Sequence, residues 1–366
     1  MSIIINFISL LLLIMSDGNV VWTQPALQTS RSILYNRDLS EAEQFFKQFD
    51  KGATELTKMS SEASWNYETD LTSENLRKTV DLSVLVSEFF LNATEGVSRI
   101  KSLDLPTAMF RQASIIRRNA DSASSELRRE IRLLEGRMTS IFGKAKVCRK
   151  RKNTTCKYLS LEPHLTNIMG KSRDLKELLF AWKSWRDAVG PGIKPYYEKL
   201  VDLLNIGARE HGWLDYGNFL RSEYEQGDDL ELNLKKVWNE VKPLYDELHA
   251  YVRYRLKQLY KRRLNMSSSG TIPAHVLGDM FAQNWENIFD VIKPYSNVDN
   301  FDVTDTMKRK QYTVEKLFRL AESFFVSIGL YKMPDNFWKK SVIKKKTGKE
   351  MVCHPSAWDL SNGDVR

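Results

Sequence analysis

Histidine and cysteine are scarce in this sequence, and their spacing limits the chemistry that they could perform. A helical zinc site of a hydrolase needs two histidines four residues apart on one helix face, with a glutamate beside the first. No two of the five histidines have that spacing, and no nucleophile elbow, P-loop or dinucleotide-binding glycine pattern occurs. The spacing of these residues therefore predicts no catalytic centre. The five are His164, His211, His249, His275 and His354.

The three cysteines indicate where the protein folds. Cys148 and Cys156 flank a polar, basic loop. In an oxidising compartment they could close a small ring that stabilises the fold by about 2–3 kcal/mol. Cys353 is left over, which in a secreted chain means a free thiol, an intermolecular bond or a missing partner.

The amino terminus resembles a secretory leader. Residues 3–15 are mostly apolar, too short a run to span a bilayer and as long as a signal-peptide core. We expect a signal peptide over residues 1–23 and a secreted, extracellular chain over residues 24–366 with no membrane span. The sequons at Asn92, Asn153 and Asn265 fit this expectation, as glycan acceptors on exposed loops.

The formal net charge of +9 comes from basic clusters near residues 149–152, 253–263 and 339–349. Nucleic-acid binding is one interpretation, and a solvated basic surface is the other. The clusters are scattered and no nucleic-acid motif accompanies them, so we expect no nucleic-acid partner.

The periodicity of apolar residues predicts an all-α fold. Residues 40–70 and 73–90 should form two paired helices, and residues 126–142 a helix with one apolar stripe. Residues 161–190 predict two helices that end at Gly190-Pro191-Gly192. Residues 234–264 predict a helix followed by a second one that Pro243 opens, and residues 276–292 predict a further helix.

Several blocks together resemble one family. They are "ASWNYETDLTSEN" at 63–75, "KVCRKRKNTTCKYLSLEPHLTNIM" at 146–169, "LLFAWKSWRDAVG" at 178–190, "LYDELHAYVR" at 244–253, "IPAHVLGDMFAQNW" at 272–285 and "VCHPSAWDLSNGD" at 352–364. In order and content they resemble the angiotensin-converting enzyme family of zinc peptidyl-dipeptidases. The resemblance implies a helical, two-lobed ellipsoid with a deep central cleft, which binds zinc and chloride and removes dipeptides from the C-termini of oligopeptides.

The resemblance also implies roles for three substrate-binding residues. Gln283 would help to hold the terminal carboxylate of the peptide, His354 would bond a substrate carbonyl, and the backbone of Ala357 would line the peptide like an added strand. The alternatives are a glutamine on a helix flank and a buried structural histidine beside Trp358.

The same resemblance implies that Arg186 and Tyr224 lie at bound chloride ions. An ion pair within its own helix is the alternative for Arg186. Pro355 stands where dipeptidase-type members often have alanine and the related carboxypeptidase branch has proline, so both specificities stay open. Proline keeps the carbonyl acceptor and lacks the N–H donor. His275 is expected to pack or cap rather than catalyse.

In the family, the H-E-x-x-H motif and a later glutamate ligand follow the block that contains His354, and the partner of Cys353 lies beyond it too. The resemblance therefore implies an incomplete domain over residues 24–366, without zinc ligands, inactive alone, with Cys353 unpaired. Uncovered apolar stripes over residues 126–142 and 234–264 would favour self-association. The alternatives are a secreted, non-catalytic peptide-binding or decoy protein and an intracellular basic scaffold, which the leader argues against.

Overall fold

The computed structural model describes residues 30–100, 105–150, 155–224, 229–295, 297 and 302–366. Helices dominate these residues, and their one sheet is a two-stranded hairpin, so the predicted all-α class is confirmed. None of the helices in these segments is both long and apolar enough to cross a bilayer. The predicted signal peptide over residues 1–23 and the sequon at Asn153 lie outside the described residues.

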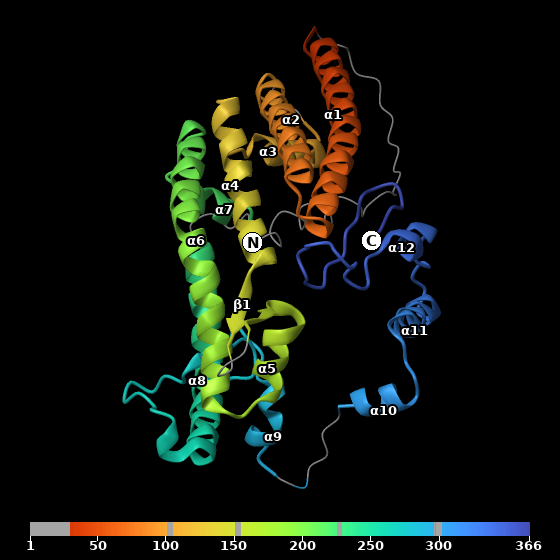
Figure 1. Cartoon of the computed structure of the whole chain (residues 1–366). Coiled ribbons are helices and arrows are strands. Elements are labelled where there is room, and N and C mark those ends of the chain that lie inside the picture. The colour runs from red at the N-terminus through yellow and green to blue at the C-terminus, as the bar shows by residue number, and fades with distance from the viewer. Residues whose placement is uncertain (1–29, 101–104, 151–154, 225–228, 296, 298–301) are drawn as a thin grey trace.

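The predicted pair of N-terminal helices is confirmed. Helix α1 (Ser30–Thr69) and helix α2 (Ser73–Ser98) lie side by side, with α3 (Thr107–Arg117) against α2 (Figure 1). The Thr72 side chain accepts a hydrogen bond from the Asn75 amide, which caps the first turn of α2. A small apolar cluster joins the three helices; its buried members are Ala42, Phe46, Ala93, Val97, Ala113 and Ile116.

The predicted helix over residues 126–142 is helix α4 (Ser125–Lys144). Ser124 caps it by accepting a bond from the Leu127 amide. Its apolar stripe packs against α6 (Leu175–Glu210), and the expectation of an uncovered stripe is therefore wrong here. The buried residues at this contact are Ile131, Leu134, Met138, Leu200 and Leu203.

The predicted helix end at Gly190-Pro191-Gly192 is wrong, because α6 runs through it without a break. Pro191 removes a backbone donor, but it lies on the exposed face, where water can bond the freed carbonyl. On the opposite face, Ile193 packs against apolar clusters on both sides of this point. Tertiary packing therefore continues the helix where local propensity would end it.

Cys148 and Cys156 are joined by a disulfide, with Cα atoms 5.5 Å apart, so this predicted pair is confirmed. Sequence periodicity missed the antiparallel hairpin that carries them, β1 (Lys146–Arg149) and β2 (Lys157–Ser160). Strands this short give no readable alternation. The turn Leu161–Leu165 and helix α5 (Thr166–Lys171) follow. A cluster that includes Val147, Leu159, Leu165, Met169, Leu178, Trp185 and Met280 packs this region against α6.

Helix α7 (Tyr216–Ser222) precedes helix α8 (Asp229–Tyr260), which is continuous through Pro243. The predicted helix start at Pro243 is wrong because this residue, like Pro191, faces solvent and its freed carbonyl partner can bond water. The second half of α8 is buried, through Val252, Leu256 and Tyr260. Its first half exposes an apolar face, as predicted.

The predicted helix over residues 276–292 is mostly absent. The structure has one-turn helices at Ala274–Val276 and Glu286–Ile288, and helix α9 (Phe289–Ile292). Between them the chain turns sharply, with φ of +90° at Gly278 and +58° at Ala282. Beyond α9, helices α10 (Thr304–Arg309), α11 (Val314–Ser327) and α12 (Asp335–Lys340) stand apart from the other helices, and the last segment returns beside α1 (Figure 1).

Candidate functional site

Gln283 lies on a tight turn between α8 and α9. The Asp279 carboxylate accepts hydrogen bonds from the backbone amides of Phe281 and Asn284, both at 2.5 Å. These bonds satisfy donors that a helix would otherwise use, so they explain the missing helix. The Gln283 side chain is exposed. The interpretation of Gln283 as a residue on a helix flank is therefore wrong, and its carboxamide is accessible to a ligand.

Arg186 fixes this turn from helix α6. Its guanidinium donates to the Met280 carbonyl oxygen at 2.6 Å and stacks over the Trp182 ring, with 3.9 Å between its central carbon and the ring centre. Burial lowers the pKa of Arg186, and the nearby Asp279 carboxylate opposes that shift. Its neighbour Asp187 pairs with Lys183 instead, so the predicted ion pair within the helix is wrong. The chloride role of Arg186 stays a prediction.

Tyr224 follows α7 and is 66% exposed. Its backbone amide donates to the Arg221 carbonyl oxygen at 3.2 Å. Within the described segments no hydrogen bond, ion pair or ring contact joins Tyr224 to Arg186, and the chloride role of Tyr224 stays a prediction.

His354 and Ala357 lie in the irregular segment that follows α12, and both are exposed. The interpretation of His354 as a buried structural histidine is therefore wrong. Trp358 is buried instead: its ring meets the Trp65 ring of α1 edge to face, with centres 5.7 Å apart. The Trp358 indole N–H donates to the Ser356 hydroxyl at 2.9 Å. Ala357 is thus held between two positioned neighbours.

A C-terminal hairpin, residues 358–366, anchors this segment to α1. The Trp358 amide donates to the Arg366 carbonyl oxygen at 2.7 Å, and the Arg366 amide donates back at 2.8 Å. The Arg366 guanidinium bonds Asp364 at 2.9 Å and Glu62 of α1 at 3.2 Å. Hydrogen bonds from Arg366 and Lys340 lower the pKa of Asp364 to about 2. The hairpin is therefore fixed both by apolar packing and by charge pairs.

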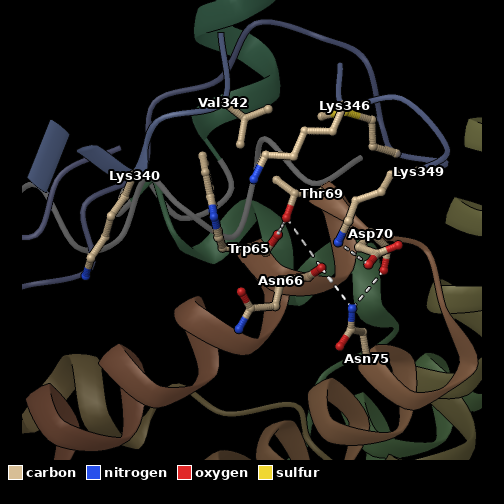
Figure 2. Close-up of a pocket in the computed structure, with 10 residues that line it drawn as sticks. Trp65, Asn66, Thr69, Asp70, Asn75, Lys340, Val342, Lys346 and Lys349 are labelled. Carbon is tan, nitrogen blue, oxygen red and sulfur yellow. Dashed lines mark hydrogen bonds and ion pairs between the residues drawn. The ribbon is translucent and has the colours of Figure 1, made fainter. Parts of the chain in front are cut away.

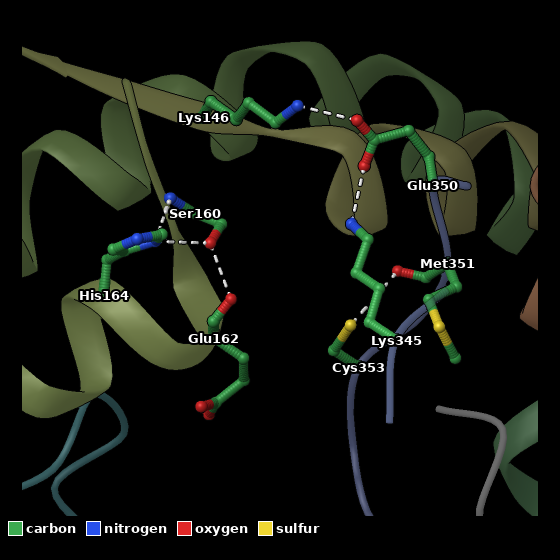
Figure 3. Close-up of polar contacts among 8 residues, drawn as sticks. All are labelled: Lys146, Ser160, Glu162, His164, Lys345, Glu350, Met351 and Cys353. Atoms are coloured by element: carbon green, nitrogen blue, oxygen red, sulfur yellow. Dashed lines mark hydrogen bonds and ion pairs between the residues drawn. The ribbon is translucent and has the colours of Figure 1, made fainter. Parts of the chain in front are cut away.

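Just before His354, a carboxylate ties the segment to the β hairpin. Glu350 accepts hydrogen bonds from Lys146 at 2.6 Å and from Lys345 at 2.9 Å, and these bonds lower its pKa (Figure 3). The Cys353 thiol is free and lies 3.8 Å from the Met351 carbonyl oxygen. Burial raises the pKa of Cys353, which disfavours the reactive thiolate.

The predicted binding residues form two groups, and different elements of the fold position each group. Gln283 belongs to the turn beside α6, whereas His354 and Ala357 belong to the segment that rests on α1. Asp279 was missed by the motif search, although an aspartate after glycine at a turn is a recognisable signal.

Of the sequon asparagines, Asn265 is exposed in a loop, and Asn92 is exposed within helix α2, which corrects the expectation of a loop there.

The described residues do not provide a zinc site. Among them, no group of three or more histidine, cysteine, aspartate or glutamate side chains lies close enough to hold a metal ion. His275 is half-buried, and this burial lowers its pKa.

The chain is similar to known proteins over most of its length. A family model for angiotensin-converting enzyme matches residues 36–366. The chain is 38% identical over 344 residues to the angiotensin-converting enzyme of Mesocricetus auratus and 39% identical over 335 residues to that of Mus musculus. It is 37% identical over 327 residues to that of Theromyzon tessulatum. These alignments cover 92%, 89% and 88% of this chain, but only 26%, 25% and 53% of the respective relatives.

Proposed function

The chain belongs to the angiotensin-converting enzyme family, and on that basis we propose that it supplies the peptide-binding wall of a secreted zinc peptidyl-dipeptidase. The observation that supports this proposal most is the family match over residues 36–366, which includes the turn of Gln283 and the segment of His354 and Ala357. All three residues are exposed. Their accessibility suits the recognition of an oligopeptide.

Each residue has a distinct role in this proposal. The Gln283 carboxamide donates to the terminal carboxylate of the peptide, and the His354 ring bonds a peptide carbonyl. The Ala357 backbone pairs with the extended peptide, as an added strand does. Pro355 has a backbone carbonyl and no N–H. At that position it can therefore accept a hydrogen bond from the peptide backbone but cannot donate one. The described residues hold and orient the peptide, and no proton transfer is assigned to them.

The proposal also includes chloride binding, glycosylation and an extracellular location. Arg186 and Tyr224 are proposed to lie near bound chloride, Asn265 and Asn92 to carry glycans, and the protein to work outside the cell. A second candidate is a non-catalytic peptide-binding protein of the same fold, since the H-E-x-x-H motif does not occur in the 366 residues. Both candidates bind the same peptides, and neither predicts cleavage by the polypeptide of residues 1–366 alone. An in-frame H-E-x-x-H motif in the transcript downstream of Arg366 would support the first one.

The first prediction concerns peptide binding by Gln283. A fluorescent pentapeptide with a free terminal carboxylate should bind the purified polypeptide more tightly than its C-terminal amide. Gln283→Ala should weaken binding of the acid about tenfold, because a hydrogen bond to a charged group is lost. Binding of the amide should not change. Fluorescence anisotropy measures both affinities.

Two variants control this experiment. Gln258→Ala, an exposed glutamine on α8, should leave both affinities unchanged. His354→Ala should weaken the acid and the amide alike, because the carbonyl that it bonds is present in both. Equal affinity for acid and amide in the unmodified protein would contradict the role of Gln283.

A further inference from the structure

A cavity of about 350 Å³ lies where the last segment of the chain crosses the junction of α1 and α2 (Figure 2). None of the proposed peptide-binding residues lines it. The α1–α2 side contributes Trp65, Asn66, Thr69, Asp70 and Asn75, and the crossing segment contributes Lys340, Val342, Lys346, Lys349 and Met351.

One hydrogen-bond donor that lines this cavity is held in place by its neighbours. Trp65 is only 9% exposed and packs against Trp358 and under the Arg366 guanidinium, so its ring cannot turn away. No described residue accepts a hydrogen bond from its indole N–H, and Trp65 lines the cavity (Figure 2). An indole N–H can only donate a hydrogen bond, so this group is available to an acceptor that enters the cavity.

Among the described residues, one of the lysines that line the cavity has no acidic partner. Lys349 pairs with Asp70 at 2.5 Å, and Lys340 pairs with Asp364 at 2.8 Å, outside the cavity. Lys346 has no acidic partner among the described residues, and its ammonium points into the cavity toward Trp65 (Figure 2). Because Asp70 is already neutralised, an anion that enters meets net positive charge.

The size and the walls of the cavity select the kind of anion. A water molecule occupies roughly 30 Å³ of liquid, so an inorganic ion would fill little of this volume. Cavities of roughly 300–1,000 Å³ hold organic ligands. Val342 and Met351 provide apolar wall beside the polar donors. We infer that the cavity binds a small organic carboxylate, held by the Lys346 ammonium and the Trp65 indole N–H.

Ligand-observed NMR with benzoate in chloride-free buffer tests this inference on the full polypeptide. Benzoate should bind, and benzyl alcohol, which has the same ring without the charge, should not. Lys346→Gln should weaken benzoate binding about tenfold, since it removes a charge-assisted hydrogen bond. The matched control Lys344→Gln, an exposed lysine of the same segment that does not line the cavity, should have no effect.

Each other outcome overturns the inference. Equal loss in both lysine variants would mean diffuse charge attraction, and tight binding of inorganic sulfate in place of benzoate would mean a simple ion site. As a control, Lys346→Gln should melt at the same temperature as the parent protein, because the exposed lysine has no structural role. Gln283→Ala should leave benzoate binding intact, so this inference and the proposed peptide site can fail independently.

Discussion

The purified polypeptide of residues 1–366 is expected to form oligomers whose size rises with concentration, because α8 and α11 each expose an apolar face. On α8 the apolar residues recur at steps of three and four along the first half of the helix. They are Leu234, Val237, Val241, Leu244 and Leu248, each between 48% and 74% exposed. On α11 the exposed apolar residues include Val314, Phe318, Leu320, Phe324 and Phe325.

The magnitudes favour association. Covering a half-exposed aliphatic or aromatic side chain gains about 1 kcal/mol. When two copies associate through these faces, the ten residues of each copy are covered, and together they offer about 20 kcal/mol against a cost of association of about 4–15 kcal/mol. A net gain of about 8 kcal/mol corresponds to a dissociation constant of about 1 µM, so the degree of association should depend steeply on the apolar area.

A single charge on this face should therefore shift the equilibrium. Leu244→Lys removes the most exposed of the five α8 residues and adds a charge that must stay hydrated, so it should lower the apparent molecular mass. Asn239→Lys adds the same charge on the exposed polar face of α8 and should change nothing. Analytical ultracentrifugation over a hundredfold range of concentration measures both. A monomer at every concentration in the parent protein would contradict this expectation.

The second large effect is expected at Trp358. This side chain is 7% exposed and packs edge to face on Trp65, so Trp358→Ala should lower the free energy of unfolding by about 3–5 kcal/mol. Trp358→Phe keeps an aromatic ring and should lose less than half as much. Chemical denaturation measures the loss for each variant.

Tyr331 provides the matched control, because it is an aromatic residue that is 92% exposed. Tyr331→Ala should change the free energy of unfolding by less than about 0.5 kcal/mol. If the Trp358 and Tyr331 variants melted alike, the C-terminal hairpin would not be part of the cooperative fold. The proposed positions of His354 and Ala357 would then lose their support.

Local rules predicted the elements that local chemistry decides. Helix α4 has a serine cap, a glutamate in its first turn and a stripe of period 3.6, and its prediction was confirmed within two residues at either end. Helix α6 was predicted to end at Gly190-Pro191-Gly192, because the sequence does not reveal that Pro191 lies on an exposed face while Ile193 packs on the other. Which face of a helix is exposed at a proline depends on the tertiary fold.

The candidate site could be predicted as a set of residues and only partly as an arrangement. The resemblance supplied Gln283, His354 and Ala357, and the disulfide followed from composition and context. The turn that exposes Gln283 depends on Asp279 bonding two amides and on Arg186 reaching across from α6. The anchor of the other segment depends on Arg366 meeting Glu62, more than three hundred residues earlier. Such contacts leave no periodic signal.

The central claim is that the turn of Gln283 holds the carboxyl end of a bound peptide. Photo-crosslinking tests it most directly, with a peptide whose last residue carries a benzophenone and keeps a free carboxylate. After irradiation, peptide mapping should place the label within residues 278–286, and Gln283→Ala should remove most of it. Label confined to the C-terminal hairpin, or the same labelling by the C-terminal amide, would contradict the claim.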